Sequence, residues 1–195
     1  MTSRAATDLP PATDLGHLPL YGLDIETDTS VDGLDPETSA VVAASVVGED
    51  VELVLDGPEP GLLRRLDEAL AELSPGVITT WNGARFDLPF LQSRAGRHGV
   101  PLGLHVHDRG ASWHRHLHLD GYLLYRADVG RSLRFPCGLK AMARLVGLPA
   151  VEVDASRVHL LSASEVRRYV TSDARVTRQL VQRRWPAAAT FVDLP

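Results

Sequence analysis

The chain has 195 residues, 44% hydrophobic and 23% charged, a composition that excludes wholesale disorder. At roughly 150 residues per domain, this length predicts one domain with a core that needs no disulfides. No apolar run approaches the ~20 residues that cross a bilayer, and residues 1–20 contain no apolar signal-peptide segment. Cys137 is the single cysteine, which excludes an internal disulfide and a cysteine zinc site. We therefore expect a cytoplasmic protein with no membrane partner.

Charge is distributed unevenly along the chain, although the net charge is only −5. Residues 1–75 hold 16 Asp and Glu against 3 Arg, a balance of −13, and residues 76–195 hold 17 Lys and Arg against 9 Asp and Glu, a balance of +8. The asymmetry favours a polyanion, such as a nucleic acid, as a partner of the C-terminal part. Five central arginines are candidates for tracking a nucleic-acid strand, with a merely solvated surface as the alternative: Arg109, Arg115, Arg126, Arg131 and Arg134.

The first half of the chain predicts mostly strands. Residues 1–17 carry two consecutive prolines and no periodicity, so we expect a disordered lead-in followed by a single domain over 18–195. A leucine face predicts a helix over 59–73. Short apolar runs predict four strands, over 18–26, 41–48, 51–56 and 76–81.

The second half alternates helices with irregular stretches. Amphipathic patterns and stop signals predict three helices, over 86–99, 138–148 and 162–185. Ser162 and Glu165 have the spacing of a capping box at the start of the last helix, with Ser164 as an alternative cap. Residues 100–135 show no clear period beyond a short strand at 116–120, and we expect an irregular loop there. Antiparallel strands followed by alternating strands and helices indicate a mixed-sheet α/β fold.

Three segments carry carboxylates in positions that suggest chemistry. Asp24 and Glu26 are two apart in a strand, so both side chains point to one face, which is costly unless a cation joins them. Asp87 precedes an amphipathic helix. Tyr169 and Asp173 are one turn apart on the last helix and share a face. Each segment alone has an ordinary alternative: an exposed acidic strand face, a helix N-cap, or a common helical pair.

The wider context of these segments is more specific. The first reads Leu-Asp-Ile-Glu-Thr over 23–27, and the third is Tyr169-x-x-x-Asp173, with Arg168 five residues before the aspartate. The second contains Asn82, Phe86, Asp87, Pro89, Phe90 and Leu91. In order and context they resemble the motifs of the DEDD superfamily of 3′–5′ exonucleases, in the tyrosine (DEDDy) branch found in the proofreading domains of family B DNA polymerases. The similarity extends over 18–185 and includes a family-like aspartate, Asp120.

The resemblance implies a ribonuclease-H-like α/β fold, with a mixed central sheet flanked by helices. It also implies two divalent ions, Mg²⁺ or Mn²⁺, which suit ligation by carboxylate oxygens alone. By resemblance Asp24 bridges both ions, Glu26 and Asp173 complete the first metal site, and Asp87 holds the second.

The activity that the resemblance implies is 3′–5′ exonuclease hydrolysis by a stand-alone enzyme. Tyr169 would orient the attacking water, since a phenol with a pKa near 10 is a poor base at neutral pH. Thr27, Asn82 and Phe86 would grip the terminal nucleotide. The expected substrate is the 3′ end of single-stranded DNA, hydrolysed to 5′-mononucleotides, and DNA repair is the expected setting.

Other functions stay open at this point. An exoribonuclease would use the same site, because nothing in the sequence reveals how a ribose 2′-OH is treated. A non-catalytic nucleic-acid-binding module would be expected to have lost at least one carboxylate, and none is lost. Five histidines between residues 105 and 118 could form a transition-metal site or, through His107-Asp108, an HD-type pair, although surface histidines are the simpler interpretation. They are His105, His107, His114, His116 and His118.

Overall fold

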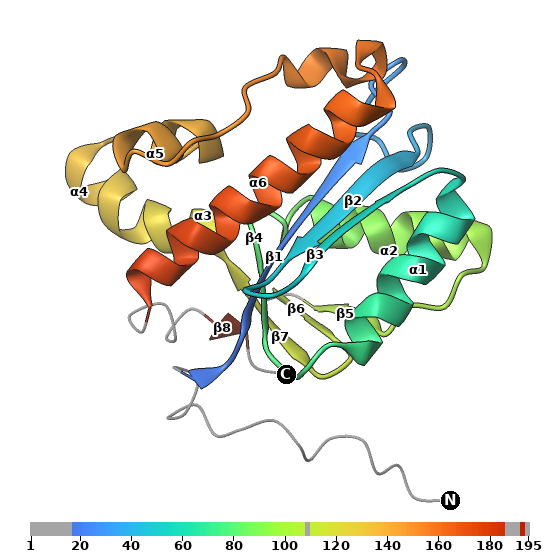
Figure 1. Ribbon diagram of the computed structural model, residues 1–195, viewed down its shortest axis with the longest axis horizontal. Helices are drawn as coiled ribbons and strands as arrows, with labels where there is room; N and C mark the ends of the chain where they lie inside the picture. The colour runs from blue at the N-terminus through green and yellow to red at the C-terminus, as the bar shows by residue number, and fades with distance from the viewer. Residues whose placement is uncertain (1–16, 108–109, 186–191, 194–195) are drawn as a thin grey trace, which may run out of the picture.

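A computed structural model describes residues 17–107, 110–185 and 192–193 of the chain (Figure 1). Of the expected N-terminal lead-in, only His17 falls within these residues. The strands form one mixed sheet, and helices cover both of its faces. The strands are β1 (Leu20–Thr27), β2 (Val41–Val47), β3 (Glu52–Asp56), β4 (Val77–Thr80), β5 (Leu104–His107), β6 (Gly110–Trp113), β7 (His116–Asp120) and β8 (Val192–Asp193).

The sheet has the order β3-β2-β1-β4-β7-β6-β5, and β8 pairs with β7 outside this path. β1, β2 and β3 form an antiparallel meander, whereas β4 is parallel to both β1 and β7. The predicted mixed sheet is therefore confirmed, and so are the four strands expected in the first half of the chain. β1 lies inside the sheet between β2 and β4, and its successive side chains point to opposite faces of the sheet.

Helices cover the two faces of the sheet. The buried leucines of α1 and α2 pack against Leu23 and Ile25 of β1 on one face, while α6 lies across β1, β2 and β3 on the other (Figure 1). In the described ranges, no helix is both long and apolar enough to cross a membrane. The helices are α1 (Glu59–Glu72), α2 (Asp87–His98), α3 (Gly121–Tyr125), the π-helix η2 (Arg126–Gly130), α4 (Arg131–Leu133), α5 (Leu139–Leu145), the 3₁₀ helix η3 (Ala155–Leu160) and α6 (Ala163–Arg184).

The start of α6 and its approach to β1 follow from particular residues. Ser162 and Glu165 form the predicted capping box, in which each side chain pairs with the backbone of the other residue. Further along, a Cβ atom on Gly22 would lie 2.0 Å from the carbonyl oxygen of Ala174. Only glycine therefore permits this contact between β1 and α6. The contact brings the side chains next to Gly22 on β1 close to those next to Ala174 on α6.

The stretch from Val100 to Phe135 differs from the expected irregular loop. It contains the β5–β6 hairpin and the short helices α3, η2 and α4. The hairpin is attached to α1 through Asp67, whose Oδ1 accepts hydrogen bonds of 2.7 Å from the backbone of Gly103 and from Trp113 Nε1. Such short elements are stabilised by contacts distant in sequence, which no local period reveals. Of the five central arginines, Arg109 lies outside the described residues.

Candidate active site

Two of the candidate carboxylates extend from β1 toward α6. Leu23 and Ile25, which alternate with them, are buried in the core on the opposite face. Asp24 and Glu26 therefore share the face that Gly22 presents to α6. Both side chains are half-buried, so their charges are only partly solvated.

The residues of the third motif lie on α6, on the side that packs against the sheet. Tyr169 and Asp173 are buried, with 7% and 6% of their surfaces exposed. Asp173 immediately precedes Ala174, the residue that contacts Gly22. The close approach of strand and helix thus brings the third motif next to the first.

Asp87 is the first residue of α2 and is also buried, at 6% exposure. The turn that leads to it is held by Asp120 at the end of β7, whose carboxylate accepts hydrogen bonds from the backbone of Asn82 (2.9 Å) and Ala84 (3.2 Å). Asn82 adopts the left-handed conformation, with φ of 67°. Asp120, which the sequence suggests as a family-like residue, is therefore a positioning residue for the turn that carries the second motif.

Asp24 and Glu26 lie within the electrostatic influence of Asp87 and Asp173. Burial, followed by the charges of Glu26, Asp173 and Asp87, raises the pKa of Asp24 well above its ordinary value. Burial and the charges of Asp173 and Asp87 raise the pKa of Glu26 to about 8. For Asp87 burial raises the pKa to about 7, and for Asp173 it raises the pKa to about 6. Like charges in a partly dry site oppose ionisation, so this arrangement favours binding of a cation.

Lys140 is a functional candidate that sequence reasoning missed. Its ammonium, at the start of α5, forms an ion pair with Asp173 and lies 4.6 Å from the centre of the Tyr169 ring. The Lys140 charge lowers the pKa values of Asp24, Glu26 and Asp173, in opposition to burial. One signal was available: Lys140 is the single lysine among 20 basic residues, where arginine is otherwise always used.

The side chains fit divalent ions by their chemistry. Four carboxylates offer only oxygen ligands, the donors that Mg²⁺ and Mn²⁺ prefer, and their mutual repulsion is relieved by positive charge. Within residues 17–107, 110–185 and 192–193, no three His, Cys, Asp or Glu side chains are already close enough to hold one metal ion together. An ion held by three of these carboxylates would require them to move closer together, and Asp173 would have to leave its ion pair with Lys140.

The expected nucleotide-gripping residues lie near these carboxylates in the sequence, and their role stays a prediction. Thr27 is buried and its hydroxyl donates a 2.6 Å hydrogen bond to the carbonyl of Gly33. Phe86 is half-buried and packs against Phe90, with ring centres 5.3 Å apart. Asn82 is half-buried in the turn before Asp87.

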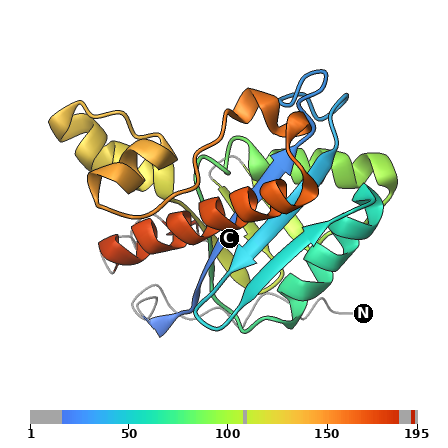
Figure 2. The same cartoon turned by 45° about the horizontal axis from the view of Figure 1, so that its top comes forward.

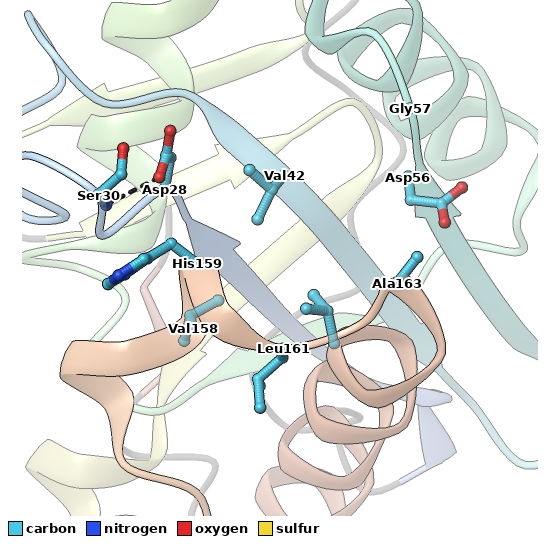
Figure 3. Close-up of a pocket in the computed structure, with 10 residues that line it drawn as sticks. Asp28, Ser30, Val42, Asp56, Gly57, Val158, His159, Leu161 and Ala163 are labelled. Carbon is cyan, nitrogen blue, oxygen red and sulfur yellow. Dashed lines mark hydrogen bonds between the residues drawn. The ribbon is translucent and has the colours of Figure 1, made fainter.

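A cavity of about 640 Å³ adjoins the site at the N-terminal end of α6 (Figure 3). Asp28, Ser30 and His159 lie at one side of it, and Val42 and Val158 contribute apolar walls. Val166, one helical turn before Tyr169, also lines it. None of the four candidate carboxylates lines the cavity, so it neighbours the site rather than forming it.

Three histidines of the central stretch make contacts that support the fold, whereas His105 and His107 are exposed on β5. His116 Nε2 pairs with the carbonyl of Leu70 at 2.8 Å, and His118 Nε2 with Thr80 Oγ1 at 2.8 Å. His114 lies 3.0 Å from Asp67. Leu70 and Asp67 lie on α1 and Thr80 lies at the end of β4, and among the residues that the structure describes no three His, Cys, Asp or Glu side chains could hold one metal ion. The alternative of a histidine metal site therefore gains no support.

Parts of the chain are similar in sequence to known DNA polymerases. Residues 37–103 match the family model described as DNA polymerase family B, exonuclease domain. DNA polymerase II of Escherichia coli is 35% identical over 78 residues, and DNA polymerase 1 of Saccharolobus solfataricus is 26% identical over an alignment that covers 92% of this chain. The chain spans only 10% and 24% of these two relatives.

The fold is shared with a solved structure. The family B DNA polymerase of Pyrobaculum calidifontis superimposes with a TM-score of 0.75 at 24% identity, over 91% of this chain and 25% of that one. The predicted ribonuclease-H-like fold is therefore confirmed, and so is the resemblance to the exonuclease domain of family B DNA polymerases. The family match contains Asn82, Phe86 and Asp87, whereas the residues on β1 and α6 lie outside it.

Proposed function

We infer that this chain, which is related in sequence and fold to the exonuclease domain of family B DNA polymerases, is a metal-dependent 3′–5′ exonuclease acting on single-stranded DNA. The observation that carries this proposal is the convergence of four carboxylates from β1, α2 and α6, each with a raised pKa. Perturbed titratable groups that face one another are typical of catalytic sites. The product would be a 5′-mononucleotide.

The carboxylates would hold two Mg²⁺ or Mn²⁺ ions, with Asp24 between them. Glu26 and Asp173 would complete one site and Asp87 the other. When bound, such ions lower the pKa of a water molecule and neutralise charge on the leaving oxygen. The protein's own contribution is to hold these ligands on rigid elements, with Asp120 fixing the turn before Asp87.

Tyr169 would act as a hydrogen-bond donor and not as a base. Burial, followed by the charges of Asp173 and Glu26, raises the pKa of its phenol above the ordinary value of 10. The hydroxyl therefore stays protonated at neutral pH. From α6 it would orient the attacking water toward the phosphorus atom.

Lys140 would position Asp173 and Tyr169. We expect Lys140→Met to lower the hydrolysis rate about 10–100-fold, the usual cost of losing a group that orients metal ligands. Because its positive charge competes with cations for Asp173, the same variant should bind Mn²⁺ at least as tightly as the wild type. Titration of Mn²⁺ by calorimetry and of activity would test both effects.

Lys140→Arg is the matched control, since it keeps the charge and changes the geometry. We expect it to retain Mn²⁺ affinity close to that of the wild type. Weaker Mn²⁺ binding in Lys140→Met than in Lys140→Arg would contradict the electrostatic role and indicate that Lys140 only supports the local fold.

The proposed function is tested with oligomers labelled at the 5′ end. We expect single-stranded DNA to give a ladder that shortens from the 3′ end with Mg²⁺ or Mn²⁺, and no cleavage with EDTA or in Asp173→Asn. RNA of the same sequence is assayed in parallel, and faster cleavage of RNA would favour an exoribonuclease. Binding of DNA without any cleavage, equal in the wild type and the variant, would overturn the assignment in favour of a binding module.

A further inference from the structure

A helical arm borders the candidate site. The arm consists of residues 126–138: η2, α4 and the segment that returns to α5. In Figure 2 it extends beyond the sheet on the side of α5. Its return segment is attached to the turn of the second motif, because Trp81 Nε1 donates a 3.0 Å hydrogen bond to the carbonyl of Cys137. Three residues after Cys137, Lys140 reaches Asp173. The arm thus leads directly to the carboxylates.

The arm presents positive charge without internal compensation. Arg126, Arg131 and Arg134 are exposed, and in the part of the chain that the structure describes none of them forms an ion pair. The acidic residue of the arm, Asp128, is paired with Arg184 of α6. Six other arginines do have carboxylate partners: Arg94, Arg97, Arg144, Arg167, Arg175 and Arg184.

Apolar and strained positions accompany this charge. Leu133, between Arg131 and Arg134, is 68% exposed. Arg134 has φ of 51°, a left-handed conformation that is unfavourable for a side chain with a Cβ by about 1–2 kcal/mol. An arginine held at a position that suits glycine is a candidate for a role of its own, because strain of this kind gathers at functional sites.

We propose that the arm binds the sugar–phosphate backbone of a single strand whose 3′ end lies at the carboxylates. The inference rests on the proposed function and adds where the strand runs. Arginines contact phosphates, and an exposed apolar side chain offers contact to bases without reading their sequence. Arg134 is six residues before Lys140, so it lies at most about 20 Å along the chain from the site.

The test measures binding separately from catalysis. The double variant Arg131→Gln/Arg134→Gly is compared with the wild type by fluorescence anisotropy, using single-stranded DNA and RNA 20-mers in EDTA at several salt concentrations. We expect Kd to rise about tenfold or more. The slope of log K against log salt should fall by about 0.7 for each lost phosphate contact, or about 1.4 for both.

Two controls keep the result interpretable. Arg134→Gly removes an unfavourable backbone conformation, so its thermal stability should not fall, and weaker binding cannot then be attributed to unfolding. Arg64→Gln/Arg65→Gln removes the same charge from exposed positions of α1, on the opposite face of the sheet. We expect that variant to bind DNA with nearly the salt slope of the wild type.

Hydrolysis of thymidine 5′-(p-nitrophenyl phosphate), which has no strand to bind, separates this inference from the proposed function. The arm variant should hydrolyse this ester at the wild-type rate. Unchanged Kd and salt slope in the arm variant would overturn the inference, whatever the activity. A wild type that cleaves neither oligomer nor ester would overturn the proposed function, and the arm's role in binding would then be decided by anisotropy alone.

Discussion

Replacing Asp24 by asparagine is expected to abolish hydrolysis and, in EDTA, to stabilise the folded protein. The hydrolysis rate should fall on the order of 1000-fold or more, because the substitution removes a preorganised charge at the centre of the site. Stability should increase because Asp24 is the carboxylate whose pKa is raised by burial and by three neighbouring carboxylates at once. Relief of about 1 kcal/mol corresponds to roughly 2–4 °C in Tm for a chain of this size.

The stability effect has a defined pH dependence. Burial and neighbouring charges raise the pKa of Glu26 from 4.5 to about 8, and burial raises that of Asp87 from 3.8 to about 7. Between about pH 4 and pH 8 the folded protein therefore binds more protons than the unfolded chain, and its stability falls as pH rises through this window. Asp24→Asn should reduce this fall, and Mg²⁺ should oppose it in the wild type.

Thermal unfolding at pH 5.5 and pH 8.5, with EDTA or Mg²⁺, measures these effects. Asp28→Asn is the matched control: Asp28 follows β1 two residues after Glu26, but hydrogen bonds from Ser30 lower its pKa. Neutralising Asp28 should therefore give no gain in Tm at pH 8.5. A lower Tm for Asp24→Asn than for Asp28→Asn in EDTA at pH 8.5 would show that the carboxylates do not repel one another.

The parts of the fold that could be predicted from the sequence are those whose signals are local. Alternation in β1 places Asp24 and Glu26 on one face, and a spacing of four places Tyr169 and Asp173 on one side of α6. The capping box at Ser162 sets the start of α6 to within a residue. These local rules give the direction of each side chain. Only the family resemblance indicated that the three segments meet in space.

The features that could not be predicted depend on contacts between distant residues. Lys140 lies on a short helix without any motif, and only the fold brings it to Asp173, 33 residues later. The arm is similar: its return segment is fixed by Trp81, 56 residues before Cys137. Neither contact has a period or spacing that a reading of the chain can detect. Only the composition singled out Lys140, as the single lysine among 20 basic residues.

A buried ion cluster around Glu59 illustrates the same limit and leads to the largest expected loss of stability. The sequence indicates only that Glu59 begins a helix. In the structure its carboxylate accepts hydrogen bonds from Arg94 Nε (2.8 Å) and Nη2 (2.6 Å), from the backbone of Val41 (2.8 Å), and pairs with His98 Nε2 (2.6 Å). Arg94 also donates to the carbonyl of Pro36 at 2.8 Å. The cluster joins α1, α2 and the start of β2.

Glu59→Gln should therefore lower the free energy of unfolding by about 3–5 kcal/mol, because it leaves the Arg94 guanidinium buried without a counter-ion. In the wild type, burial raises the pKa of Glu59, but hydrogen bonds from Arg94 and Val41 outweigh it and lower the pKa below 4.5. The stabilisation is thus present above pH 4.5 and is lost as pH falls through the lowered pKa. The variant should lack this acid-dependent loss.

Urea unfolding at pH 7 and pH 4 distinguishes this cluster from ordinary surface charge. Glu68→Gln, at an exposed position of the same helix, should change stability by less than about 0.5 kcal/mol. The double variant Glu59→Leu/Arg94→Met should recover much of the loss. It replaces both buried charges with apolar side chains, whereas Glu59→Gln leaves one charge buried and unpaired. A cost below about 1 kcal/mol for Glu59→Gln at pH 7 would mean that water reaches Arg94, and that the cluster orders these elements without stabilising the fold.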